Sequence, residues 1–264
     1  MKKLVAAALG MSLALTGIAM PAVADAKGDE IAHKYFDLKK ADDTRAPGSV
    51  MTLIDKSGGR KTRRMDIFYQ EKATGKNAYM VFSEPADVNG TKFLTIGHRG
   101  ADSDERLYLP ALKKTRRIAA SGKDGEFVNS DLWFYDLEER YFEDNTYTFL
   151  SDNETIADKA FDGMKFAKIE MRPTKADCPY ARAVAFVNMA DNFVYRMDCY
   201  DKKDGSLLKT IQFVSVDQIK GVLVPTRMIV SNFKKGTKTL LQLNGVEVNV
   251  GLKDEVFSVK NLEQ

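Results

Sequence analysis

The chain has 264 residues, of which 44% are hydrophobic, and its 40 basic and 37 acidic residues give a formal charge of +3. This length fits one large all-β domain or two small domains. The near-neutral balance argues against nucleic acid as the main partner, because phosphate contacts need clustered excess positive charge.

The first 24 residues have the three parts of an export signal. Lys2 and Lys3 form the basic part, an apolar stretch runs from Leu4 to about Met20, and Ala22-Val23-Ala24 fits the small-x-small cleavage pattern. We therefore expect a signal peptide over 1–24, cleavage before Asp25 and a periplasmic mature chain with 38 basic and 37 acidic residues. The alternative is an uncleaved membrane anchor, which the glycines and polar residues within the stretch disfavour.

The rest of the chain predicts one helix followed by many short strands. Residues 27–40 can place apolar side chains on one helical face, with charges around the remainder. Alternating segments separated by turn residues predict strands at 49–56, 60–71, 77–83, 92–98, 105–109, 147–150, 164–172, 182–189, 193–200, 207–214, 223–233 and 237–248. Residues 130 to about 145 interrupt this pattern, and their apolar side chains fall loosely at helical spacing.

These elements predict a mainly β (α+β) fold. Short connections between many strands indicate a large curved antiparallel sheet, or an incomplete β-barrel. We expect an N-terminal helix, and a helical insert after residue 130 that covers an apolar cavity in the sheet. Because no repeat or Pro- or Ser-rich linker divides the chain, residues 25–264 are expected to form a single domain.

No pattern typical of an active site occurs in the sequence. His33 and His98 have no metal-ligand spacing with cysteine or a carboxylate. There is no Gly-x-Ser-x-Gly elbow, and Ser57-Gly58-Gly59 lies between two strands instead of opening a helix, as a phosphate loop would. We therefore expect no catalytic residue, no metal and no cofactor, and the protein is not expected to be an enzyme.

The two cysteines, Cys178 and Cys199, are candidates for a disulfide. Both lie near the ends of neighbouring expected strands, and an exported protein meets an oxidising compartment. Closing a loop of this size would contribute about 3 kcal/mol on the chain-entropy model. The alternative, a thiol-redox motif at Cys178-Pro179-Tyr180, is disfavoured because Ala181 stands where a second cysteine would be required.

Two further segments each allow two interpretations. The basic run Lys113, Lys114, Arg116 and Arg117 is either a solvated edge strand that resists aggregation or a patch that contacts a partner or anionic lipid headgroups. The aromatic residues between 133 and 142 either pack onto the sheet or form a lid over an apolar cavity, since curved sheets of this size can enclose a ligand.

Three short segments carry a family resemblance. They are Arg106-Leu107-Tyr108-Leu109-Pro110, the basic run from Leu112 to Ile118, and Phe127-x-x-Ser130-Asp131; Pro225-Thr226 and Glu255-Val256-Phe257-Ser258 agree in style. The chain resembles the outer-membrane lipoprotein-sorting family, the LolA/LolB-like superfamily, and its longer branch associated with RND-type exporters. It departs from the family pattern at Asn129 and at Leu132-Trp133-Phe134.

The resemblance implies a periplasmic carrier that shields lipid or lipoprotein acyl chains between the inner and outer membranes. It also implies an inner-membrane RND-type transporter as partner and transient membrane-surface contact. An envelope-stress sensor or adaptor that binds mislocalised lipoproteins is the main alternative, and an envelope hydrolase is the least favoured one. We expect inward-facing residues of the early strands, together with Trp133, to line the cavity: Leu53, Met65, Ile67, Phe82, Phe93 and Leu109.

Overall fold

The computed structural model describes residues 25–264. The expected signal peptide, 1–24, lies outside these residues. Residues 25–264 contain three α-helices, α1 (Ala26–Phe36), α2 (Phe134–Leu137) and α3 (Val259–Glu263). Short 3₁₀ helices are η1 (Pro110–Leu112), η2 (Ala120–Gly122), η3 (Phe127–Asn129), η4 (Phe142–Asp144), η5 (Lys159–Phe161) and η6 (Asp254–Phe257).

Fourteen strands form one antiparallel sheet. Its first half contains β1 (Asp43–Ile54), β2 (Arg60–Lys72), β3 (Gly75–Glu84), β4 (Lys92–Ile96), β5 (Asp104–Leu109) and β6 (Lys114–Ile118). Its second half contains β7 (Asn145–Glu154), β8 (Phe166–Pro173), β9 (Tyr180–Asn188), β10 (Val194–Asp201), β11 (Leu207–Ile219), β12 (Val222–Asn232), β13 (Thr237–Gln242) and β14 (Glu247–Val248).

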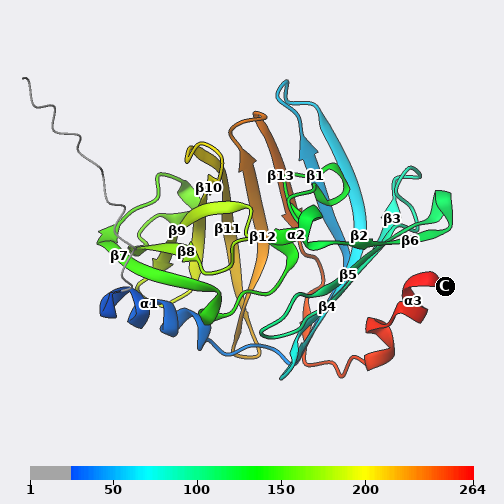
Figure 1. Cartoon of the computed structure of the whole chain (residues 1–264), viewed down its shortest axis with the longest axis horizontal. Coiled ribbons are helices and arrows are strands. Elements are labelled where there is room, and N and C mark those ends of the chain that lie inside the picture. The colour runs from blue at the N-terminus through cyan, green and yellow to red at the C-terminus, as the bar shows by residue number, and fades with distance from the viewer. Residues whose placement is uncertain (1–24) are drawn as a thin grey trace, which may run out of the picture.

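The two halves meet where the first strand pairs with one of the last. The strand order is β6-β5-β4-β3-β2-β1-β13-β12-β11-β10-β9-β8-β7, with β14 also paired to β1. Because β6 and β7 do not pair with each other, the sheet stays open. The expected fold class, a curved antiparallel sheet that forms an incomplete barrel, is confirmed (Figure 1).

A bulge bends the strand that joins the halves. The pairing of β1 with β2 shifts register between Ala46 and Ser49, where Gly48 has a φ of 61°. An extra residue in one strand increases the local bend and twist, and glycine accepts this positive φ without strain. The sheet therefore curves next to the seam between its two halves.

Helix α1 packs against the edge strand β7. Asp25 caps the helix by accepting a hydrogen bond from the Gly28 N–H, and its carboxylate also accepts one from the N–H of Phe149 in β7 (2.7 Å). A Cβ on Gly28 would lie 2.9 Å from the Phe149 nitrogen, so only glycine allows this approach. The expected helix over 27–40 is confirmed but ends earlier, at Phe36.

The segment between the two halves, residues 119–144, lies across one face of the sheet, which we call the inner face. The sequence predicts one or two helices from residue 130 to about 145, but α2 has four residues and most of the segment is irregular. Its backbone bonds close a tight loop instead, with Phe127 N–H donating to Leu132 O and Phe134 N–H to Gly125 O. Val128 and Asn129 adopt positive φ values, which end a helix.

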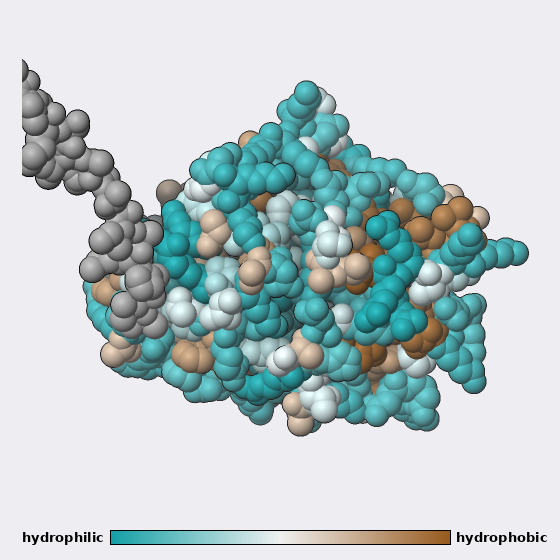
Figure 2. All heavy atoms as spheres, in the orientation of Figure 1, coloured by the Kyte–Doolittle hydropathy of each residue, from teal (hydrophilic) through white to brown (hydrophobic). Residues whose placement is uncertain are grey.

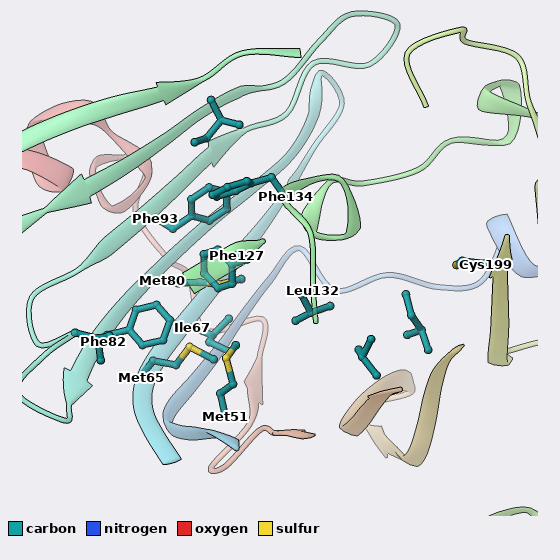
Figure 3. Packing of buried hydrophobic residues seen from close by; sticks show 14 of the residues in the cluster. Met51, Met65, Ile67, Met80, Phe82, Phe93, Phe127, Leu132, Phe134 and Cys199 are labelled. Atoms are coloured by element: carbon teal, nitrogen blue, oxygen red, sulfur yellow. The ribbon is translucent and has the colours of Figure 1, made fainter. Parts of the chain in front are cut away.

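The inner face and the opposite face carry separate clusters of buried residues. Phe93 of β4 and Leu107 of β5 point inward, where Phe82, Phe93, Phe127 and Phe134 pack together (Figure 3). Their neighbours Leu94 and Tyr108 point outward and are covered by Phe257 and Leu262 of the C-terminal segment. Side chains therefore alternate between the two faces along each strand, as the period of two requires.

Candidate functional site

A cavity of about 450 Å³ opens on the inner face. Both halves of the sheet contribute to it, together with the insert and the segment that follows α1. Its volume falls in the range of roughly 300–1,000 Å³ that is typical of small-molecule sites. In the space-filling view, hydrophilic residues cover most of the surface, while hydrophobic residues gather near β3, β6 and α3 (Figure 2).

Methionine is prominent in the wall of this cavity. Six methionines line it: Met51, Met65, Met80, Met171, Met197 and Met228. Ile211, Phe213 and Leu241 add aliphatic and aromatic surface from β11 and β13. Because methionine is flexible and polarisable, such a wall can adapt to irregular apolar ligands.

The residues expected to line the cavity do not all reach it. Met65 lines the cavity, at the side where Met51 and Met80 also lie (Figure 3). Four others belong to the adjoining apolar cluster without lining the cavity: Leu53, Ile67, Phe82 and Phe93. Leu109 lies at the end of β5, next to η1, and belongs to neither set.

Trp133 also lies outside the cavity wall. Its ring stacks on Tyr180, with centroids 5.3 Å apart, and the Lys209 ammonium lies 4.0 Å above it. Tyr180 itself lines the cavity, so Trp133 supports the wall from behind. The insert covers the cavity mainly through Phe127, Leu132 and Tyr135.

A buried ion pair fixes the insert to the second half of the sheet. The Lys209 ammonium of β11 lies 2.7 Å from Asp136 Oδ2, with side-chain exposures of 0% and 3%. The Tyr180 hydroxyl donates to Asp136 Oδ1 (2.5 Å), and the backbone N–H of Trp133 donates to Asp136 Oδ2 (2.8 Å). Lys209 also donates to Asp131 O (3.0 Å). The charges of this pair are therefore well satisfied inside the protein.

A second group of charged side chains lines the cavity around Glu139, near the end of the insert. Glu139 lies between two lysines, with Oε1 2.6 Å from the Lys40 Nζ and Oε2 3.2 Å from the Lys76 Nζ. Glu71 lies 3.5 Å from Lys40. Burial alone would raise the pKa of Glu139, but Lys76 and Lys40 hold it below its ordinary value. We call Lys40, Glu71, Lys76 and Glu139 the mouth cluster.

Glu105 is a buried carboxyl behind the insert. It lies on β5, opposite Thr95 of β4, is 0% exposed, and neither of its carboxyl oxygens has a hydrogen-bond partner among residues 25–264. Burial and then Glu138 raise its pKa to about 8, although Lys123 and Arg140 act in the opposite direction. The group is therefore a neutral acid at neutral pH.

The two cysteines expected to form a disulfide are free thiols in this structure. The pairing of β9 with β10 places Cys199 opposite Ala183, five residues beyond Cys178. Cys178 instead donates from Sγ to the Tyr135 hydroxyl (2.9 Å). Burial raises the pKa of both thiols, which keeps them protonated and poorly reactive.

The basic run lies in β6 and just before it, and β6 forms one edge of the sheet, the position that the edge-strand interpretation predicts. Lys113, Lys114, Arg116 and Arg117 are all exposed, and so is Leu112 at the tip of the hairpin. Arg117 pairs with Asp104 at 3.0 Å. Within the described part of the chain, the other three form no ion pair.

The described residues hold no group of three or more His, Cys, Asp and Glu side chains arranged to bind a metal ion. His33 stacks on Phe142, with ring centroids 3.8 Å apart, and so has a packing role. From residue 25 onward, no helix is both long and apolar enough to span a bilayer.

Comparison with known proteins places this geometry in a family. A family model described as "Uncharacterized protein" matches residues 74–264. None of the curated proteins matches the chain. A solved structure described as an outer membrane lipoprotein-sorting protein domain, from Vibrio parahaemolyticus, is 28% identical with a TM-score of 0.82, covering 90% of this chain and 99% of its own.

Two other solved structures agree. A DUF1329 family protein from Desulfovibrio piger is 28% identical with a TM-score of 0.82, over 89% of this chain and 98% of its own. A LolA superfamily protein from Nitrosomonas europaea is 20% identical with a TM-score of 0.66, over 91% of this chain and 100% of its own, and it supports the fold alone.

Proposed function

Since the chain belongs to the family whose model matches residues 74–264, and shares its fold with an outer-membrane lipoprotein-sorting domain and a LolA superfamily protein, we propose that it is a periplasmic carrier of lipid or lipoprotein acyl chains. The observation that carries this proposal is the apolar cavity of about 450 Å³ under the insert. The protein would act by binding and release instead of catalysis. An inner-membrane RND-type transporter as partner, and movement towards the outer membrane, are parts of the same proposal that rest on the resemblance of residues 106–131.

The energetics of such cargo fit the cavity wall. Each buried CH₂ of an acyl chain contributes about 0.8 kcal/mol, so a mostly apolar cavity can hold one chain firmly. A carrier must also release its cargo. The methionines of the wall suit this need, because they adapt to different chains without the close fit that makes release slow. We infer that Met65 contacts cargo directly and that Trp133 contributes by holding Tyr180 in place.

The proposed membrane-surface contact uses the basic edge strand. Lys113, Lys114 and Arg116 are exposed and form no ion pair with described residues, and the exposed Leu112 lies beside them. A basic patch near an anionic bilayer gains about 1 kcal/mol per Lys or Arg. The same patch also protects the sheet edge from pairing with other strands, and the two roles are compatible.

Cargo binding can be tested on protein purified from a bacterial periplasm without detergent. Native mass spectrometry should detect a bound lipid or acylated peptide, and organic extraction should identify it. Protein that is empty and also takes up no fluorescent fatty-acid probe would contradict the carrier function and favour a protein-binding sensor or adaptor.

A cavity-filling variant makes this test specific. Ala183 is half-buried and lines the cavity, so Ala183→Trp should fill part of it and weaken probe binding by about tenfold, or about 1.4 kcal/mol. Ala120→Trp adds the same side chain at an exposed position and should leave binding unchanged. Equal binding by both variants would show that the probe binds elsewhere.

A further inference from the structure

We propose that Lys40 and Lys76 form an anion-binding site at the cavity mouth, which takes the carboxylate or phosphate head group of a lipid whose chain lies in the cavity. In the structure, the Glu139 carboxylate occupies the position of that head group. The inference rests on the proposed carrier function and adds the chemical class of its ligand: an anionic amphipathic lipid.

The geometry of Glu139 supports this assignment. Its two oxygens bridge two ammonium groups, at 2.6 Å from Lys40 and 3.2 Å from Lys76. Lys40 lies between α1 and β1, Lys76 is the second residue of β3, and Glu139 follows α2 in the insert. Two lysines that hold one carboxylate in this way can hold the similar oxygens of a carboxylate or phosphate ligand.

The mouth cluster is open enough to exchange partners. The side chains of Lys40, Lys76 and Glu139 are 41%, 34% and 17% exposed, whereas the Lys209–Asp136 pair is sealed. Ion pairs within reach of water contribute only about 0–1 kcal/mol. An incoming anion can therefore replace Glu139 at a small cost in stability.

Most of the other charged groups of the cavity wall have partners of their own, whereas Lys39 is exposed and forms no ion pair among the described residues. Asp43 accepts hydrogen bonds from three backbone N–H groups of residues 250–252. Glu138 pairs with Lys123 at 2.8 Å and with Arg140 at 3.2 Å. Among the described residues, Lys76 has Glu139 as its one carboxylate partner, and Lys40 has Glu139 and Glu71. Lys40 and Lys76 are thus two cations of the wall that already converge on one carboxylate, which is the geometry that an anionic ligand needs.

Both sides of the cluster remain charged. Burial alone would lower the pKa of Lys76, but Glu139 raises it above its ordinary value. The neighbouring Tyr35 is a neutral phenol, because burial and then Glu139 raise its pKa to about 12. Glu139 therefore acts as a competitor built into the insert, which lowers the affinity for anionic cargo and returns to the lysines when cargo leaves.

The test compares three ligands with the same chain: palmitate, hexadecyl phosphate and the uncharged hexadecanol. Each displaces a neutral fluorescent probe from the full mature protein. We expect wild-type protein to prefer the two anions over hexadecanol, and the stronger of them identifies the head group. Glu139→Gln should bind the anions about three- to tenfold more tightly, a gain that misfolding cannot produce, and should bind hexadecanol as before.

Lys76→Met should lose the preference for anions and keep its affinity for hexadecanol. Lys72→Met is the matched control, because Lys72 is similarly exposed (38%) and pairs with Asp254 away from the cavity. If all three ligands bind alike to the wild type, or if Glu139→Gln and Lys76→Met leave the preference unchanged, the anion site is disproved while the carrier function stands. If no ligand binds to the wild type, both proposals fail.

Discussion

Two carboxylates of the insert, Asp136 and Glu139, form ion pairs with lysines, and these pairs differ in burial. Asp136 pairs with Lys209 in a site where both side chains are almost fully buried. Glu139, three residues later, pairs with Lys40 and Lys76 at the mouth of the cavity, where water reaches all three. The chemistry is the same, a carboxylate against ammonium groups. The difference in solvent access assigns the first pair to structure and the second to exchange with a ligand.

Physical reasoning explains this division. Moving two charges out of water costs several kcal/mol, and a buried pair is tolerated where hydrogen bonds satisfy the remaining sites. Asp136 accepts such bonds from the Tyr180 hydroxyl and the backbone N–H of Trp133. Once formed, the buried pair resists separation, because one buried charge without its partner has a higher free energy than the buried pair. The mouth cluster carries a smaller penalty, since water can reach each group when its partner leaves.

Asp136→Asn tests directly whether the buried pair stabilises the fold. We expect it to lower the free energy of unfolding by about 3–5 kcal/mol, because it leaves Lys209 buried without its counter-charge. Urea denaturation followed by tryptophan fluorescence would measure this loss, since the single tryptophan, Trp133, stacks beside the site.

Glu139→Gln is the matched control, because it makes the same type of change in the same insert. It should cost less than about 1 kcal/mol. A similar loss for the two variants would show that both pairs are structural, and would remove the basis for an exchangeable site at the mouth.

The fold was largely predictable from sequence, because alternation and turn residues are local signals. Strand β2 shows the alternation in Met65, Ile67 and Tyr69, and the expected segment 60–71 agrees with the observed Arg60–Lys72. Strand β6 could be suggested only as one of two interpretations of the basic run, because its basic side chains lie on an exposed edge and give no apolar alternation.

The conformation of the insert was not predictable, because distant residues determine it. Asp131 accepts hydrogen bonds from Thr237 and Thr239, more than one hundred residues later in the chain, and its own N–H donates to Thr239. These bonds replace the local bonds of a helix. The apolar spacing of Leu132, Tyr135 and Leu137 is satisfied by packing against the inner face instead.

The candidate site was predictable only in its apolar part. Met65 was found because it faces inward on an early strand. The mouth cluster combines residues from three distant segments, and no spacing in the sequence links Lys40 and Lys76 to Glu139. One available signal was the charged run Glu138-Glu139-Arg140 within an otherwise aromatic insert, because such a run must find partners wherever the insert packs.

Glu105 differs from both Asp136 and Glu139, because it is buried and its carboxyl oxygens have no hydrogen-bond partner among the described residues. Its pKa of about 8 exceeds the ordinary value of 4.5, so between these two pH values the folded state binds more protons than the unfolded state. Stability therefore falls as pH rises through this window, by up to about 1.4 kcal/mol per pH unit, and the slope from this group ends above pH 8. Urea denaturation at pH 6, 7, 8 and 9 would measure the slope.

Glu105→Gln removes the titrating group and keeps the shape of the side chain. Its stability should lose this part of the pH dependence and exceed that of the wild type at pH 9. Thr95→Val, a change at the residue opposite Glu105, keeps the carboxyl and should keep the slope. An unchanged slope in Glu105→Gln would mean that another group titrates in this range.

Lys113 and Lys114 are exposed, whereas Asp136 is buried. Substitutions of these two lysines should therefore change the free energy of unfolding the least. Lys113→Glu/Lys114→Glu should change the free energy of unfolding by less than about 0.5 kcal/mol, because both side chains are exposed. The same variant should bind vesicles that contain anionic phosphatidylglycerol more weakly, with a loss of about 1 kcal/mol for each lysine removed. Added salt should weaken wild-type binding in the same way.

Lys159→Glu/Lys165→Glu makes the same change of net charge at two exposed lysines, one at the start of η5 and one shortly after its end. Sedimentation with anionic and with neutral phosphatidylcholine vesicles separates a local patch from a general charge effect. If the two double variants lose vesicle binding equally, only net charge matters, and the basic run is then a solvated edge. If only Lys113→Glu/Lys114→Glu loses binding, the tip of the β5–β6 hairpin is the contact. The exposed charges of this hairpin would then contribute by binding a membrane, whereas the buried Asp136–Lys209 pair contributes by stabilising the fold.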